Sequence, residues 1–163
     1  MKNILSLFII LGFSISHASS DSIQKIYIDR AKNVHVVVGG QDRQLTTQGG
    51  AVDASVSENM KFAAWLTLNS WVAPGESEPS PSLISVFHDG RVQSVGCGAF
   101  IREYWFWRGG VYVAIDCGGL HFAGEEILYD ARSLRKVDSF YQVEIPLEKR
   151  PEWSSSGTGR VDE

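Results

Sequence analysis

The stretch Phe100–Phe140, FIREYWFWRGGVYVAIDCGGLHFAGEEILYDARSLRKVDSF, decides the fold. It contains four short runs of β-branched and aromatic residues, FIREYWFW, VYVAID, EEILYD and KVDSF, separated by segments rich in glycine or charge. Runs of this length between turn signals are typical of antiparallel strands. The stretch therefore predicts one four-stranded antiparallel sheet.

A second stretch, residues 51–95, follows the same plan of four strand-like runs. Its last two runs flank Asp89-Gly90, and Asp-Gly between apolar runs is a strong signal for a two-residue hairpin turn. Residues 71–82 hold three prolines, which cannot donate to a strand ladder, so this segment predicts a long exposed loop. Two blade-like sheets are thus expected in succession along the chain.

Three shorter strand-like runs precede these stretches, at residues 25–29, 33–38 and 43–46. No window shows helical periodicity, and strand-like runs every 8–12 residues or so are typical of sandwiches and propellers. Each longer stretch is about as long as one propeller blade, roughly 40–45 residues. The sequence predicts an all-β, antiparallel, propeller-like fold, partial or irregular, of about three blade-like sheets. Four residues are expected at inward positions on central strands: Trp65, Phe106, Val113 and Leu128.

The N-terminus has the features of a secretory signal peptide. Lys2 supplies a positive charge, residues 4–13 form an apolar run too short to span a bilayer, and Ser16-His17-Ala18 places small residues before a cleavage site. We expect cleavage after Ala18 and a periplasmic or secreted location. The expected organisation is a signal peptide at 1–18, a single β-domain at 19–147 and a flexible polar C-terminal tail at 148–163.

The charge balance argues against nucleic-acid binding. The chain has 15 lysines and arginines against 19 aspartates and glutamates, a formal net charge of −4 at pH 7. Nucleic-acid binding depends on clustered positive charge, and the sequence shows no basic cluster. After the signal peptide no second long apolar run follows, so no transmembrane segment is expected after processing.

Cys97 and Cys117 are the two cysteines of the chain. A disulfide is the default expectation in an exported protein. Pairing through the Gly-Gly turn places Cys117 opposite about Ile101, so the bond requires residues 96–99 to fold back. A Cys–His nucleophile pair with His121 is the disfavoured alternative, because a lone cysteine pair in an exported protein is usually structural.

One segment carries a family resemblance. Arg43-Gln44-Leu45-Thr46 is followed by Gly49-Gly50, by the alternating run Ala54-Ser55-Val56-Ser57 and by the apolar run Phe62-Ala63-Ala64-Trp65. This order resembles the propeller repeat of TolB-type bacterial proteins, although Glu58-Asn59-Met60 stands where that family favours Pro-Asp-Gly. The resemblance implies an architecture and not an activity.

A closed propeller needs about four blades or more, and this chain holds about three. Its exposed sheet edges are therefore expected to be covered, blunted or paired with a partner, and a dimer through sheet edges is one such pairing.

A second resemblance points to a function. The segments Trp107-Arg108-Gly109-Gly110-Val111 and Ile127-Leu128-Tyr129-Asp130, the latter followed by Lys136-Val137, accompany a signal peptide and a short propeller-like β-fold. This combination resembles small exported immunity proteins that protect bacteria from type VI-delivered peptidoglycan amidases. The resemblance implies that a loop plugs the active site of the toxin, and the corresponding loop here is Cys117–Glu125.

That loop supplies the first candidate partner-binding residues: Gly119, Leu120, His121 and Phe122. Glycines at both ends allow unusual backbone conformations. Two apolar side chains around one imidazole would suit insertion into a cleft of a partner, where a few buried anchors carry most of the binding energy. The alternative is that Leu120 and Phe122 fold back onto their own sheet.

The aromatic run Tyr104–Trp107 supplies the second candidates, Trp105 and Trp107. Strand alternation sends Tyr104 and Phe106 to one face of the sheet and the two tryptophans to the other. Aromatic side chains dominate apolar burial. In one interpretation both faces of the run are therefore covered by other parts of the protein. In the other, one face stays exposed as a binding platform for a protein or glycan.

The sequence contains no signature of a catalytic or metal site. His35 alternates with valines on the outward face of a strand, His88 lies in a turn, and His121 lies in a loop with Asp116, Glu125 and Glu126 nearby. Closely paired metal ligands, a Gly-x-Ser-x-Gly elbow, a phosphate loop and a dinucleotide fingerprint are all missing from the sequence. We expect no cofactor, no metal and no catalytic residue.

These observations predict a non-enzymatic exported protein-binding module, most concretely a periplasmic inhibitor or immunity protein that blocks a cell-wall-targeting enzyme such as a peptidoglycan-degrading toxin. Two alternatives stay open: a carbohydrate- or peptidoglycan-binding or envelope scaffold module, and a hydrolase centred on His121. Binding to peptidoglycan fragments would favour the first, and activity lost on His121→Ala would favour the second.

Overall fold

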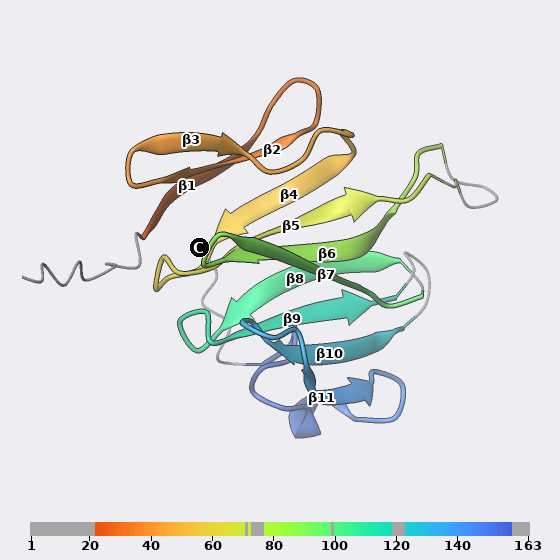
Figure 1. Ribbon diagram of the computed structural model, residues 1–163. Helices are drawn as coiled ribbons and strands as arrows, with labels where there is room; N and C mark the ends of the chain where they lie inside the picture. Colours follow the sequence, from red (N-terminus) through yellow and green to blue (C-terminus); the bar gives the residue numbers. More distant parts are fainter. Residues whose placement is uncertain (1–21, 71, 73–76, 99, 119–122, 158–163) are drawn as a thin grey trace, which may run out of the picture.

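The computed structural model describes residues 22–70, 72, 77–98, 100–118 and 123–157. This part of the chain forms three antiparallel sheets, each made of consecutive strands. The expectation of a signal peptide at 1–18 falls outside the described residues. Figure 1 shows the sheets stacked one above another, with the second sheet in the middle.

The first sheet contains β1 (Ile23–Ile28), β2 (Val34–Val38) and β3 (Gln41–Gln44). The second sheet contains β4 (Ala51–Val56), β5 (Ala63–Leu68), β6 (Pro81–His88) and β7 (Arg91–Gly96). The third sheet contains β8 (Ile101–Trp107), β9 (Tyr112–Cys117), β10 (Glu125–Asp130) and β11 (Lys136–Tyr141), and a 3₁₀ turn, η1 (Leu147–Lys149), follows it.

The all-β prediction is confirmed. The stretch Phe100–Phe140 forms the third sheet in the order β8-β9-β10-β11, and residues 51–96 form the second in the order β4-β5-β6-β7. None of the sheets closes on itself within the described residues, which fits an irregular propeller-like stack. Among the described residues, none of the helical structure is long and apolar enough to cross a membrane.

The central strands of the second sheet, β5 and β6, are buried on both faces, and this explains their apolar sequence. On one face, Ala63 and Trp65 of β5 pack with Val34 and Val36 of the first sheet. On the other face, alternate residues of β5 and β6 pack against the third sheet. Strand alternation sends successive side chains to opposite faces, so a central layer needs apolar residues at both.

The four residues expected at inward positions pack in three different clusters. Trp65 lies between the first and second sheets, whereas Val113 lies between the second and third, with Phe106 half-buried against it. Leu128 lies on the far side of the third sheet. The prediction of burial is correct for Trp65, Val113 and Leu128.

The far side of the third sheet is covered by the C-terminal segment. Trp153 is 6 % exposed and packs with Trp105, Ala114 and Leu128. Trp105 Nε1 donates to the Trp153 carbonyl oxygen at 2.8 Å, and Trp153 Nε1 donates to Asp138 Oδ2 at 3.0 Å. The expectation of a flexible tail from residue 148 is therefore corrected for residues 148–157, because one tryptophan among polar residues buries itself on the sheet.

The buried carboxylate of Glu126 anchors the same segment, and Gln142 links it to a second buried carboxylate, that of Asp116. Glu126 accepts hydrogen bonds from the Ser155 backbone N–H at 2.8 Å and from its hydroxyl at 2.7 Å. Gln142 Nε2 donates to Glu126 Oε1 at 2.8 Å and to Asp116 Oδ2 at 3.2 Å. Burial raises the pKa of Asp116, and the Arg102 guanidinium 3.0 Å away opposes that shift.

A disulfide joins Cys97 to Cys117, with a Cα–Cα distance of 6.0 Å. In the ladder Cys117 pairs with Ile101, as the sequence predicted. Cys97 follows β7 and Cys117 ends β9, so the bond ties the second sheet to the third. A closed loop of this length contributes about 3 kcal/mol in the loop-entropy model.

Candidate functional site

Hairpin turns from the second and third sheets gather at one end of the stack and are hydrogen-bonded to one another. The Asn59 N–H donates to the Gly109 carbonyl oxygen at 3.3 Å, and the Ala131 N–H donates to that of Val111 at 3.0 Å. We call this surface the turn face; it comprises residues 58–61, 89–90, 108–111 and 131–134. The start of β1 joins it through the Ile23 N–H, which donates to the Met60 carbonyl oxygen at 2.7 Å.

Glycines make this arrangement of turns possible. Gly110 has φ 92°, and a Cβ atom there would lie 2.4 Å from the Cβ of Ser57. The β8–β9 turn therefore approaches the β4–β5 turn more closely than any side chain would allow. Asp89 and Gly90 have φ 47° and 74°, the left-handed pair that a type I′ hairpin requires.

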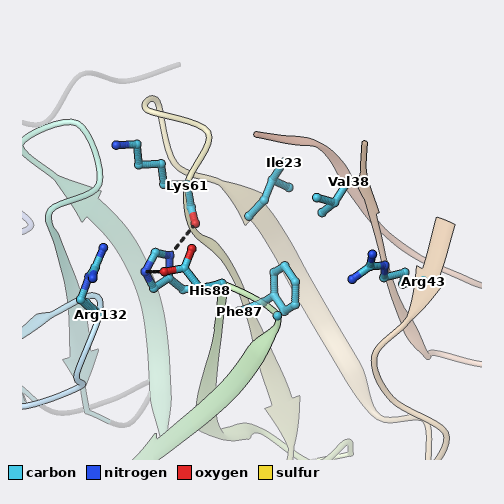
Figure 2. A pocket seen from close by; sticks show the side chains of 9 residues that line it. Ile23, Val38, Arg43, Lys61, Phe87, His88 and Arg132 are labelled. Carbon is cyan, nitrogen blue, oxygen red and sulfur yellow. Dashed lines mark hydrogen bonds and ion pairs between the residues drawn. The ribbon is translucent and has the colours of Figure 1, made fainter. Parts of the chain in front are cut away.

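A pocket of about 350 Å³ lies beside the turn face, between the first and second sheets. Figure 2 shows Arg43 and Arg132 on opposite sides, with His88 and Phe87 between them. The pocket is lined by Ile23, Val38, Arg43, Lys61, Phe87, His88, Asp89, Gly90 and Arg132. A neighbouring depression of about 330 Å³ shares His88, Asp89 and Arg132 and adds Val86, Arg91 and Gln93.

The charge of the pocket is predominantly positive. Arg43 comes from β3 of the first sheet, Lys61 from the β4–β5 turn of the second and Arg132 from the β10–β11 turn of the third. None of these three charged groups forms an ion pair or hydrogen bond with another described residue. Asp89 is the one acidic residue among those that line the pocket. The arrangement can therefore attract an anionic group.

His88 is held in a fixed orientation at the centre of the pocket. Its ring stacks on Phe62, with 4.4 Å between the ring centroids. Nδ1 lies 3.1 Å from the Lys61 carbonyl oxygen and donates to it, since a carbonyl can only accept. Nε2 lies 2.9 Å from Asp89 Oδ2. Nε2 forms no hydrogen bond with a described residue despite this proximity. Held by the ring stacking and the Nδ1 hydrogen bond, and with its side chain 11 % exposed, His88 shapes the pocket wall.

The two candidate tryptophans lie on one face of the aromatic run, as strand alternation predicted. Trp105 is buried beneath Trp153, and Trp107 is half-buried against the same cluster. Tyr104 and Phe106 face the second sheet. This placement agrees with the interpretation in which both faces of the run are covered, and a role of Trp105 and Trp107 in partner binding stays a prediction.

The loop residues Gly119, Leu120, His121 and Phe122 lie outside the described residues, and their role as partner-binding residues stays a prediction. Gly118 and Gly124, at the two ends of that loop, are described. A Cβ on Gly124 would lie 2.2 Å from the Cys117 carbonyl oxygen. The ends of the loop thus approach each other closely.

His35 lies on the outer face of the first sheet, as its alternation with valines predicted. Its Nδ1 is 3.0 Å from Asp42 Oδ1, its Nε2 is 3.5 Å from Asp29 Oδ2, and its ring stacks on Tyr27. The Tyr27 hydroxyl donates to Asp42. The hydrogen bond from Tyr27, followed by that from His35, lowers the pKa of Asp42, and the Asn33 backbone N–H lowers that of Asp29.

Sequence reasoning missed the cations of the pocket. Arg43, Lys61 and Arg132 are separated by long stretches of chain and show no local pattern. The strand order could have placed Lys61 and Arg132 at the same end of their sheets, because every second hairpin turn in an antiparallel sheet lies at the same end. Within the described residues, no group of three or more histidines, cysteines or acidic residues is arranged to hold a metal ion.

No protein-family model matches the chain, and no curated protein sequence matches it either.

Proposed function

We propose that this protein is a non-enzymatic exported protein-binding module that engages an acidic surface of its partner through the turn face and the adjoining pocket. In its most concrete form it is a periplasmic inhibitor or immunity protein that blocks a cell-wall-targeting enzyme. The proposal combines the signal-peptide features and the immunity-protein resemblance of the sequence with the charge of this surface.

The observation that carries the proposal is the convergence of Arg43, Lys61 and Arg132. Each comes from a different sheet, and none is neutralised by a described carboxylate, although the whole chain has a net charge of −4. A predominantly positive patch on a protein of net negative charge steers a complementary partner and fixes its orientation.

The composition of the turn face also supports protein binding. Met60 is 49 % exposed and Val111 is 48 % exposed, in two turns that are hydrogen-bonded to each other. Arg108, in the same β8–β9 turn as Val111, adds a further exposed cation. Methionine and arginine are enriched at protein interfaces, and pinned turns reduce the conformational entropy that is lost on binding.

A charge-reversal experiment tests the proposal. The mature protein is immobilised as wild type and as the double variant Lys61→Glu with Arg132→Glu, and periplasmic proteins retained by each are identified by mass spectrometry. The control is Arg30→Glu with Lys32→Glu, two exposed cations in the β1–β2 turn at the opposite end of the first sheet. The control changes the net charge by the same amount.

We expect a cell-wall-degrading enzyme to be retained by the wild type and the control, to be lost from the turn-face variant, and to be inhibited in a peptidoglycan-hydrolysis assay. Equal retention by the turn-face variant would refute the assignment of the surface. Retention of peptidoglycan fragments without any protein would instead favour the carbohydrate-binding alternative.

A further inference from the structure

The pocket between the first and second sheets has an apolar floor beneath its cationic rim. Ile23 and Phe87 are buried, and Val38 is half-buried beside them. Arg43, Lys61 and Arg132 are exposed and stand around this floor from three directions (Figure 2). A ligand that fills the pocket therefore needs an apolar body and a negatively charged group.

The charge pattern of the pocket favours an anion, and the apolar floor selects among anions. Asp89 lies on the pocket wall next to His88, but three cations outnumber it among the lining residues. The attraction by the cations and the repulsion by Asp89 both scale with the charge of the ligand, so charge alone does not separate a carboxylate from a phosphate. Inorganic phosphate has no apolar part to cover Ile23 and Phe87, whereas a carboxylate next to an apolar side chain satisfies both the floor and a planar guanidinium group at the rim.

The size of the pocket restricts the ligand further. At about 350 Å³ it lies near the lower end of the range for small-ligand sites, roughly 300–1,000 Å³. This volume suits one or two amino-acid side chains better than a nucleotide or a lipid. The pocket also adjoins the exposed Met60 turn through Lys61, so a segment held there would continue across the turn face.

We propose that this pocket binds a carboxylate that is carried next to an apolar side chain, as on an acidic–apolar loop of a protein partner. The assignment of the loop to a protein rests on the proposed function, whereas the carboxylate specificity rests on the pocket itself. The apolar side chain lies on Ile23 and Phe87, and the carboxylate accepts hydrogen bonds from a guanidinium group at the rim.

The test uses short peptides as probes and nuclear magnetic resonance of the ¹⁵N-labelled mature protein. N-acetyl-leucyl-glutamate amide is the acidic probe, N-acetyl-leucyl-glutamine amide is its neutral match, and inorganic phosphate is the third ligand. We expect the acidic peptide to shift the amide signals of Lys61, His88 and Gly90. A dissociation constant on the order of 1 mM is reasonable for a fragment of this size.

The variants separate the pocket from general charge effects. Arg43→Gln with Arg132→Gln should weaken binding of the acidic peptide by about tenfold or more, because each removed partner is charged. Arg30→Gln with Lys32→Gln should leave it unchanged. Both pairs are exposed, so unshifted signals elsewhere in the spectrum confirm that the variants fold.

Three results would overturn the inference: no shift with the acidic peptide, equal shifts with the neutral peptide, or tighter binding of phosphate than of the peptide at the same residues. The last would assign the pocket to a small inorganic anion. If the acidic peptide does not bind but charge reversal of the turn face abolishes capture of a partner, the pocket assignment is wrong and the proposed function stands. If the peptide binds but no partner is captured, the pocket assignment stands and the proposed function is wrong.

Discussion

Truncation of Trp153 to alanine is expected to lower the free energy of unfolding by about 3–5 kcal/mol, the range for a large aromatic removed from a core. The side chain is almost fully buried against Trp105 and Leu128. A tryptophan buries roughly 150–250 Å², and about 25 cal/mol per Å² gives an upper estimate of about 4–6 kcal/mol. The methyl group left behind retains part of this burial, whereas loss of the hydrogen bond to Asp138 removes about 1 kcal/mol more.

Urea unfolding followed by far-ultraviolet circular dichroism measures this change without depending on the fluorescence of the removed indole. The matched control is Leu147→Ala, directly before that segment, where the side chain is 65 % exposed and the expected change is within about 0.5 kcal/mol. The slope of the transition should stay constant for both variants. A loss below about 1 kcal/mol for Trp153→Ala would show that residues 148–157 do not pack on the third sheet.

Three further predictions concern other parts of the fold. Gly110→Ala should destabilise the protein by about 2 kcal/mol or more in urea unfolding, because its Cβ would meet Ser57 in a left-handed backbone conformation. In the control Gly90→Ala the space is open, so the protein should be destabilised only by the backbone strain, about 1–2 kcal/mol. Thiol titration of the denatured, unreduced protein should find no free thiol, and reduction should lower stability by about 3 kcal/mol; two titratable thiols would contradict the disulfide. Asp42 has a lowered pKa, chiefly because Tyr27 donates to it, so its stabilising contribution is present above its unfolded pKa and is lost as the pH falls through the folded value. The stability difference between the wild type and Asp42→Asn should shrink on acidification below about pH 4, and a difference that does not change with pH would contradict this account.

The second and third sheets could be predicted from the sequence because their signals are local. Strand alternation, the Asp89-Gly90 turn and the Gly109-Gly110 turn each fall within a few residues. The packing of the C-terminal segment could not be predicted in this way. Trp153 stands alone among polar residues, so no periodicity marks its contact. Ser155, which binds Glu126, belongs to a serine run typical of flexible tails.

The candidate site was less predictable than the fold for a physical reason. The direction of each side chain in the aromatic run follows from alternation, but the availability of Trp105 depends on a segment almost fifty residues away in the chain. The pocket likewise depends on how three sheets stack, because only that stacking brings Arg43, Lys61 and Arg132 to the lining of one pocket. Local patterns determine the faces of a sheet, whereas stacking determines which faces remain accessible.

The disulfide gives the molecule an uneven mechanical response. Because Cys97 and Cys117 are 20 residues apart in the chain, a force applied to the two chain ends cannot extend the segment between them, which holds β8 and β9. Reduction should lengthen the fully stretched chain by about 60–65 Å, at roughly 3.3–3.6 Å per residue less the 6.0 Å Cα–Cα distance. Under load the strands of the first sheet can separate one after another, while β8 and β9, the first two strands of the third sheet, stay within a covalent ring.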